Sequence, residues 1–236
     1  MKGDEATSLT QKRYDRQAVL FDFWEAPIEA LGFKRLRKRL WSEVQGRSLL
    51  EVGVGTGKNL PYHPQSARSV AVDLSPRMLR RAASRARRLE HDVDLVLADA
   101  QHLPFRDGAF DAAAATFVFC SVPDPVMGLQ EVRRVVRQDG GQVHLLEHVR
   151  AGNRVVGRLM DLINPVAVRL MGANINRDTV GNVARAGIAA GSVESRGLGL
   201  VKLIRGFVRG KTGVQSPAAN ELAGRSEEAL DDVAYG

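Results

Sequence analysis

The sequence predicts an α/β protein built on a doubly wound, mostly parallel sheet. Short apolar segments alternate with amphipathic helical segments between about residues 48 and 150, a glycine-rich loop directly follows the first apolar segment, and acidic residues close the next two. Such alternation places helices on both faces of parallel strands. The length of 236 residues suits one such domain with extensions.

The elements of this domain can be placed in chain order. Residues 1–12 are polar and are expected to be disordered, and residues 13–46 are predicted to form an N-terminal amphipathic helical region. Ser75 and Pro76 open a helix as an N-cap and a first-turn proline do. The core strands are expected at 48–52, 69–73, 94–98, within 109–119 and at 142–147, and a further helix at 125–138.

The pattern weakens after residue 152. The segment 152–177 is rich in Val, Leu, Met and Ile and is predicted to be a lid or substrate insertion, with a helix over 155–171 that breaks or kinks at Pro165. A helix over 178–186 follows, and residues 198–208 are expected to give two closing strands or one bent strand. The main domain would therefore span 47–210. The acidic residues 211–236 are expected to be a disordered tail.

Charge and cysteine content limit the classes of partner and compartment. Lys and Arg number 34 against 27 Asp and Glu, a formal net charge of +7, which predicts either anionic partners or simple solubility. A single cysteine, Cys120, excludes an intrachain disulfide framework and indicates a reducing compartment. The polar start and short apolar runs predict neither a secretory signal nor a membrane span. The expected location is the cytoplasm, with peripheral contact at the inner membrane face as an option.

The glycine-rich loop LLEVGVGTGKNL, residues 49–60, fails two common templates. A dinucleotide-binding loop needs G-x-G-x-x-G, but its third glycine would fall on Lys58 or Leu60. A P-loop needs glycine where Val52 stands and Ser or Thr where Asn59 stands. The loop is therefore not predicted to hold a dinucleotide or a nucleoside triphosphate.

What remains is the pattern E-x-G-x-G-x-G, in which Glu51 precedes Gly53, Gly55 and Gly57. An acidic residue disfavours a polyphosphate, whereas a bare backbone and a helix N-terminus suit the amino and carboxylate groups of a zwitterion. Asp73 and Asp99 end the next two strands, at the edge where open α/β sheets bind ligands. Together these residues indicate a site for an adenosine with an amino-acid arm, S-adenosylmethionine (SAM).

At this point the chain resembles the class I SAM-dependent methyltransferases of the methyltransferase-11 type, with a Rossmann-like seven-stranded sheet. The resemblance lies in LLEVGVGTGKNL, VAVDLSPRMLRRA, LADAQHLPFRDGAFDA and LQEVRRVVRQDGGQVHLLEH. Within that superfamily the chain is most similar to the ubiquinone/menaquinone methyltransferases and the bacterial phosphatidylethanolamine N-methyltransferases. Shorter matches at LEH (146–148) and NRDT (176–179) resemble thiol methyltransferase-like proteins.

The resemblance implies roles for particular residues. It implies that the methionine moiety is wrapped by the E-x-G-x-G-x-G residues, that Asp73 binds the ribose, and that Phe117 to Ser121 line the methyl-transfer pocket. The implied cofactor-binding set is Glu51, Gly53, Gly55, Gly57, Asp73, Leu74, Asp99, Ala100 and Phe117. CSVP stands at 120–123, where methyltransferases of DNA bases or glutamine carry an N/D-P-P-Y segment, so those substrates are not expected.

Three residues are candidates for a catalytic base. His148 follows the fifth strand, Glu147 ends it, and Tyr14 lies in the N-terminal region; each also has an ordinary interpretation as a loop, capping or core residue. Ser121 and Arg177 are candidate substrate contacts, although Arg177 could equally form a surface salt bridge. His63, His91, His102 and His144 lack metal-ligand spacing, so no metal is predicted.

Two segments bear on the methyl acceptor. FKRLRKRLW, residues 33–41, mixes aromatic, aliphatic and basic residues and is expected to contact an anionic membrane surface, the alternative being a solvated face. An apolar lid favours a hydrophobic acceptor. The leading hypothesis is N-methylation of a phosphatidylethanolamine-type lipid. The alternatives are a quinone precursor, a small thiol, or a non-enzymatic SAM-binding or RNA-binding scaffold; with aromatic residues at only 6%, no nucleic acid partner is expected.

Overall fold

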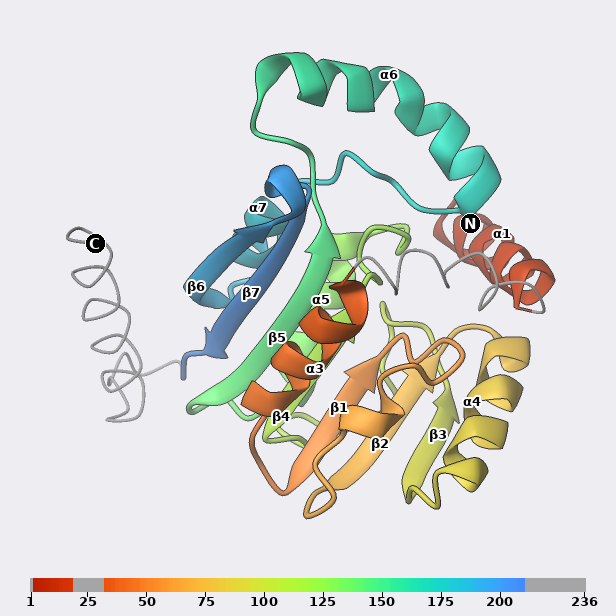
Figure 1. The fold of residues 1–236 in the computed structure, drawn as a ribbon. Helices are drawn as coiled ribbons and strands as arrows, with labels where there is room; N and C mark the ends of the chain where they lie inside the picture. Colours follow the sequence, from red (N-terminus) through yellow and green to blue (C-terminus); the bar gives the residue numbers. More distant parts are fainter. Residues whose placement is uncertain (1, 19–31, 211–236) are drawn as a thin grey trace.

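The computed structural model describes residues 2–18 and 32–210 of the chain. A seven-stranded sheet with the order β3-β2-β1-β4-β5-β7-β6 forms its centre (Figure 1). Strands β1 to β5 are parallel to one another, and β7 runs antiparallel to both β5 and β6. The strands are β1 (Ser48–Val52), β2 (Arg68–Asp73), β3 (Val93–Leu97), β4 (Ala112–Thr116), β5 (Gly141–His148), β6 (Ala189–Arg196) and β7 (Val201–Val208).

Helices cover both faces of the sheet, which confirms the predicted doubly wound α/β architecture. Trp41 of α3 packs with Leu49 and Leu146 on one face, and Ala82 of α4 packs on that face against Ala71. On the other face, side chains of α5 and α7 form the largest buried cluster with β1, β4 and β5. The helices are α1 (Lys2–Gln17), α3 (Lys34–Glu43), α4 (Pro76–Arg88), α5 (Pro125–Val135), α6 (Arg154–Met171) and α7 (Thr179–Arg185).

The N-terminal region differs from the prediction in two ways. Residues 2–17 form helix α1, although residues 1–12 were expected to be disordered, because polar side chains of this helix bond to the ends of β2 and β3. In α3 the side chains of Leu40 and Trp41 are fully buried against the sheet. The apolar part of FKRLRKRLW therefore serves the core and is not available to a membrane. Residues 19–31 of the predicted helical region lie outside the described residues.

The C-terminal half also departs from expectation. Of the break or kink predicted at Pro165, the break does not occur, because helix α6 continues through this residue. The Asn164 side chain accepts from the Ile175 amide and donates to Asn174, which fastens this turn to the chain beyond the helix. Strand β6 was not predicted because most of its side chains are exposed at the sheet edge. The predicted tail, 211–236, lies outside the described residues. No helix in the described part of the chain has the length and apolar content needed to cross a membrane.

Candidate functional site

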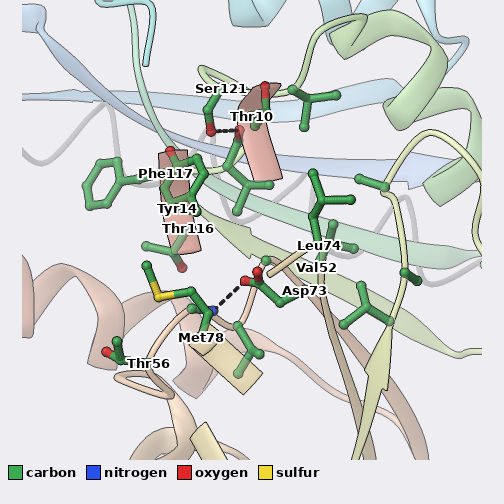
Figure 2. A pocket seen from close by; sticks show the side chains of 18 of the residues that line it. Thr10, Tyr14, Val52, Thr56, Asp73, Leu74, Met78, Thr116, Phe117 and Ser121 are labelled. Atoms are coloured by element: carbon green, nitrogen blue, oxygen red, sulfur yellow. Dashed lines mark hydrogen bonds between the residues drawn. The ribbon is translucent and has the colours of Figure 1, made fainter. Parts of the chain in front are cut away.

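A pocket opens at the carboxyl ends of the parallel strands, where the sequence placed the ligand (Figure 2). Its empty volume, with the space open to solvent at the mouth included, is about 910 Å³. Strand ends β1, β2 and β4 and the segment after β3 each supply part of the wall. Of the predicted residues, those that line it are Gly53, Gly55, Asp73, Leu74, Asp99, Ala100, Phe117, Ser121 and Tyr14.

The glycine loop has the backbone that only glycine adopts readily. Gly53, Gly55 and Gly57 have φ values of +72°, +54° and +81°. A Cβ on Gly53 or Gly57 would collide with Val118 or Leu60, whereas a Cβ on Gly55 would have no atom within 4 Å. Gly53 and Gly57 are thus required by packing. Gly55 keeps its backbone open toward the pocket, where a ligand can approach closely.

Asp73 lines the pocket beside the glycine loop. Its Oδ2 accepts from the Gly55 amide at 2.8 Å and its Oδ1 from the Ser75 amide at 2.9 Å. Burial raises the pKa of Asp73 to about 6 in spite of these two bonds. Each carboxylate oxygen keeps a free acceptor position. The side chain therefore both shapes the loop and can receive hydroxyl donors from a ligand.

Asp99, the third predicted acidic residue, is also at the pocket, and so is Ala100. The Asp99 carboxylate accepts from the Gln101 amide at 2.9 Å and from the Thr7 hydroxyl of α1 at 3.2 Å. Glu51 is different. Its side chain is fully buried and accepts from Asn59 Nδ2 at 2.6 Å and contacts His63 Nε2 at 2.8 Å. The structure therefore places Glu51 beneath the loop and not in the pocket wall.

The candidate bases Glu147 and His148 lie behind the wall and not in it. Glu147 Oε1 accepts from the backbone amides of Val118 and Phe119 at 2.8 and 3.0 Å. The His148 ring stacks on Phe117 with centroids 4.4 Å apart. Phe117 itself has a φ of +58°, a conformation rare for a non-glycine residue. Both candidates thus support the strained turn at Phe117, and of the three predicted bases only Tyr14 lines the pocket.

Of the two candidate substrate contacts, Ser121 and Arg177, only Ser121 lines the pocket. Ser121 lines the pocket and its hydroxyl donates to the Val118 carbonyl at 2.9 Å. Arg177 lies outside the wall and donates to the Val122 carbonyl at 3.1 Å, so the structure gives it a role in fixing the rim. It does not support the predicted head-group contact. Within residues 2–18 and 32–210, no three His, Cys, Asp or Glu side chains gather as a metal site would require.

Helix α1 covers the pocket, a feature that the sequence interpretation missed. Thr10 and Tyr14 line the pocket, and the Gln11 side chain donates to the Leu74 carbonyl at 3.0 Å. Asp15 accepts from the Ser75 hydroxyl at 2.6 Å. These polar residues recur at helical spacing with Thr7, on one face of α1. The segment has a stripe of polar residues at helical spacing and no apolar stripe. This pattern in the sequence could have indicated a helix that packs on a polar site.

These features are a glycine turn with an open backbone, carboxylates after β2 and β3, and an aromatic turn after β4. A family model described as "Methyltransferase domain" matches residues 50–143, the segment that holds all of them. The chain is 32% identical to the phosphatidylethanolamine N-methyltransferase of Cereibacter sphaeroides over 61% of this chain and 68% of that protein. The chain belongs to the class I SAM-dependent methyltransferases.

Other relatives of this methyltransferase have different names. The demethylmenaquinone methyltransferase of Clavibacter sepedonicus is 32% identical over 77% of this chain and 82% of that protein. The human thiol S-methyltransferase is 33% identical over 48% of this chain, which spans only half the length of that relative. A solved SAM-dependent methyltransferase from Thermotoga maritima superposes with a TM-score of 0.66 at 20% identity, covering 85% of this chain and all of the other, which shows the shared fold.

Burial of Glu147 predicts an unusual pH dependence of stability. Its pKa rises from 4.5 to about 7 on folding, so the folded state binds more protons than the unfolded chain between these values and stability falls as pH rises through them. Glu147→Gln keeps an acceptor for the Val118 and Phe119 amides and does not titrate. Relative to the parent chain, the variant should gain about 2 kcal/mol of unfolding free energy between about pH 5 and pH 8, measured by urea denaturation.

Glu131→Gln is the matched control for this experiment. The pKa of Glu131 is lowered, chiefly by the hydrogen bond from Arg134, so this variant should instead lose relative stability as pH rises through the acid range. An unchanged difference between Glu147→Gln and the parent chain across the same pH range would show that Glu147 is not buried in the way described.

Proposed function

We propose that this methyltransferase methylates a hydrophobic acceptor, the amine of a phosphatidylethanolamine-type phospholipid. The observation that supports this most is the character of the wall beyond the carboxylates, which Phe117, Val118, Val122 and Pro123 contribute. Arg37 also lines the pocket and lies over the Phe117 ring, with Cζ 5.5 Å from the ring centroid, and it donates to Asn59 Oδ1 at 3.2 Å. Glu147 and Arg177 are bonded to backbone and do not line the pocket. An apolar wall with few polar groups favours an apolar acceptor.

We assign the cofactor contacts by position in the pocket. Gly53 and Gly55 would hold the methionine arm against the loop, Asp73 would accept from the ribose hydroxyls, and Leu74, Asp99 and Ala100 would edge the adenine. The open backbone at Gly55 and the free acceptor positions on Asp73 support this fit. Gly57, Glu51 and His63 would act indirectly, by holding the loop and the turn after it.

The cofactor supplies an activated methyl group on a sulfonium, and the protein has to position and desolvate the acceptor. When a methyl transfers, the N–C bond forms from the amine lone pair, the S–C bond breaks with its electrons left on sulfur, and the amine must have lost a proton. Apolar surroundings such as Phe117 and Val118 disfavour the ammonium form and so favour the neutral nucleophile. The proton would be lost to water before the acceptor enters the pocket, and the Tyr14 hydroxyl, which lines the pocket, would accept a hydrogen bond from the neutral amine.

A direct test is to incubate the protein with methyl-labelled SAM and a total lipid extract, and then to resolve the lipids. We expect label in a phospholipid that carries an amine head group. Label in the quinone fraction would instead support C-methylation, which the demethylmenaquinone relative makes the second candidate. Label only in added small thiols would contradict the lipid proposal. The pocket variant Gly55→Arg is the negative control, because it should transfer no label to any fraction.

A further inference from the structure

Helix α6 carries a continuous apolar face that no part of the described protein covers. Val155 is 77% exposed and Leu162 is 76% exposed, and four other apolar side chains of the helix are also exposed. At 100° per residue these six fall within an arc of about 120°, which is the width of the apolar face of an amphipathic helix. The apolar face of α6 is defined by Val155, Val156, Leu159, Leu162, Ile163 and Val166.

The rest of α6 is fastened to the domain, which fixes the direction of this face. Ala167 is buried, and Asn164 bonds to Asn174, whose amide and side chain both donate to the Cys120 carbonyl. Gly172, which ends the helix, lies beside Arg13 and Tyr14 of α1. Figure 1 shows α6 standing above the carboxyl edge of the sheet with its last turns close to α1. The apolar face is therefore directed outward, next to the helix that covers the pocket.

The charges beside this face are basic. Arg154, Arg158 and Arg169 are exposed, and by helical geometry they lie together along one side of the apolar arc. None of the three has an ion pair with a residue that the structure describes. Asp161, the single acidic residue of α6, is paired with Arg150 at 2.8 Å. An apolar face bordered by unpaired arginines matches an anionic bilayer surface, with acyl chains beneath and phosphates beside them.

We propose that α6 lies in the surface of an anionic membrane and delivers the pocket mouth to the lipid. This inference rests on the proposed lipid acceptor, because it supplies that acceptor's route. The segment after α6 contacts the rim directly, through Asn174 on Cys120 and Arg177 on Val122. A membrane in contact with α6 would thus lie beside the rim, and a lipid could enter without crossing bulk water. Residues 33–41 do not offer such a face because Leu40 and Trp41 are buried.

The test uses the full chain and vesicles made of equal amounts of phosphatidylcholine and phosphatidylglycerol. The double variant Leu159→Gln/Leu162→Gln keeps good helix formers on exposed positions, so the fold should persist. We expect it to lose about tenfold or more in vesicle affinity, measured by co-sedimentation. The control is Leu89→Gln/Leu97→Gln, which removes two exposed leucines, the C-cap residue of α4 and the last residue of β3, and should bind as the parent does.

The arginines and the depth of insertion give independent readouts. Arg158→Gln/Arg169→Gln should weaken binding to the mixed vesicles and leave weak binding to pure phosphatidylcholine unchanged. Cys120 is buried, so a polarity-sensitive thiol dye can be placed on Leu162→Cys alone, and its emission should shift to the blue when vesicles are added. A blue-shifted emission already present without vesicles would mean that protein, either a second copy or another segment of this chain, covers the face, and would overturn the proposal.

The outcome can be separated from that of the acceptor assignment. SAM affinity and methylation of detergent-dispersed lipid should be the same in Leu159→Gln/Leu162→Gln as in the parent. If Leu159→Gln/Leu162→Gln binds vesicles as the parent does and the protein methylates lipid, the proposed role of α6 is wrong and the proposed function stands. If vesicle binding depends on α6 but no lipid is labelled, the proposed lipid acceptor is wrong and the membrane-binding role of α6 stands.

Discussion

Gly55→Arg should abolish SAM binding, with an affinity loss of about a thousandfold or more. Gly55 lines the pocket and a Cβ on it would meet no atom within 4 Å, so an arginine side chain would extend into the open space at the pocket. It would occupy the volume that we assign to the methionine arm and place a positive charge beside a sulfonium cation. Isothermal titration calorimetry of the purified variant against SAM measures the loss.

Gly197→Arg separates pocket filling from backbone strain. Gly197 has a φ of +53°, almost that of Gly55, and its Cβ would also meet no atom within 4 Å. It lies in the short 3₁₀ turn between β6 and β7 and does not line the pocket. An arginine in this conformation costs about 1–2 kcal/mol of stability at either position. Equal SAM affinity in both variants would show that the glycine loop is not the cofactor site.

The sequence was sufficient to predict the sheet and the place of the pocket. Strands β1, β2, β4 and β5 were predicted because parallel strands buried on both faces are continuous apolar runs. The edge strand β3 is only partly buried, and its apolar residues still marked it as a strand. Asp73 and Asp99 were located because carboxyl ends of parallel strands gather at one edge. That inference needs only the direction of each strand. Strands that alternate with helices run parallel, so their carboxyl ends lie at the same edge of the sheet.

Side-chain direction at the strand ends was not predictable in the same way. Glu51, Glu147 and His148 each end or nearly end a strand, so all three were expected at the pocket. Successive residues of a strand point to opposite faces, and a single-residue difference in where a strand ends decides which face receives the side chain. The structure turns Glu51 toward His63 and Glu147 toward the amides after Phe117.

The proposed membrane contact lies at α6 and not at residues 33–41, for a related reason. Basic and apolar residues occur together at 33–41 and also at 154–169, but from the sequence only the first segment was expected to contact a membrane, and the second was expected to be an apolar lid. Only the packing distinguishes them: Trp41 of the first segment is buried in the core, while Leu162 of the second is mostly exposed. An amphipathic pattern states that one face is apolar, and the tertiary structure decides whether that face meets the protein or the surroundings.

Comparison of two aspartates isolates what is particular to Asp73. Asp111, before β4 at the opposite edge of the sheet, also accepts from two backbone amides, those of Arg47 and Ser48. Its pKa is lowered because hydrogen bonds and nearby arginines outweigh a modest desolvation. Asp73 makes the same kind of bonds, yet burial raises its pKa to about 6. The two aspartates therefore make equivalent backbone contacts and differ in their place, because Asp73 lines the pocket and Asp111 does not.

Asp73→Ala should weaken SAM binding by at least about a hundredfold, because hydrogen bonds to a charged acceptor contribute roughly 1.5–3 kcal/mol each and the ribose offers two donors. Asp111→Ala removes an equivalent pair of backbone contacts, those from Arg47 and Ser48, at the other edge of the sheet and should leave SAM affinity unchanged. Urea denaturation of both variants reports any common loss of stability. A similar affinity for SAM in Asp73→Ala and the parent chain would refute the ribose assignment.

The pH dependence of binding gives a second reading of the same carboxylate. SAM is expected to bind the ionised form of Asp73, so protonation competes with binding below the pKa of about 6 in the free protein. Affinity should be constant above that pH and fall by about tenfold for each unit below it, and in Asp73→Asn this slope should vanish because the amide does not titrate. A slope that persists in Asp73→Asn would assign the titration to another group and leave the raised pKa of Asp73 without a part in binding.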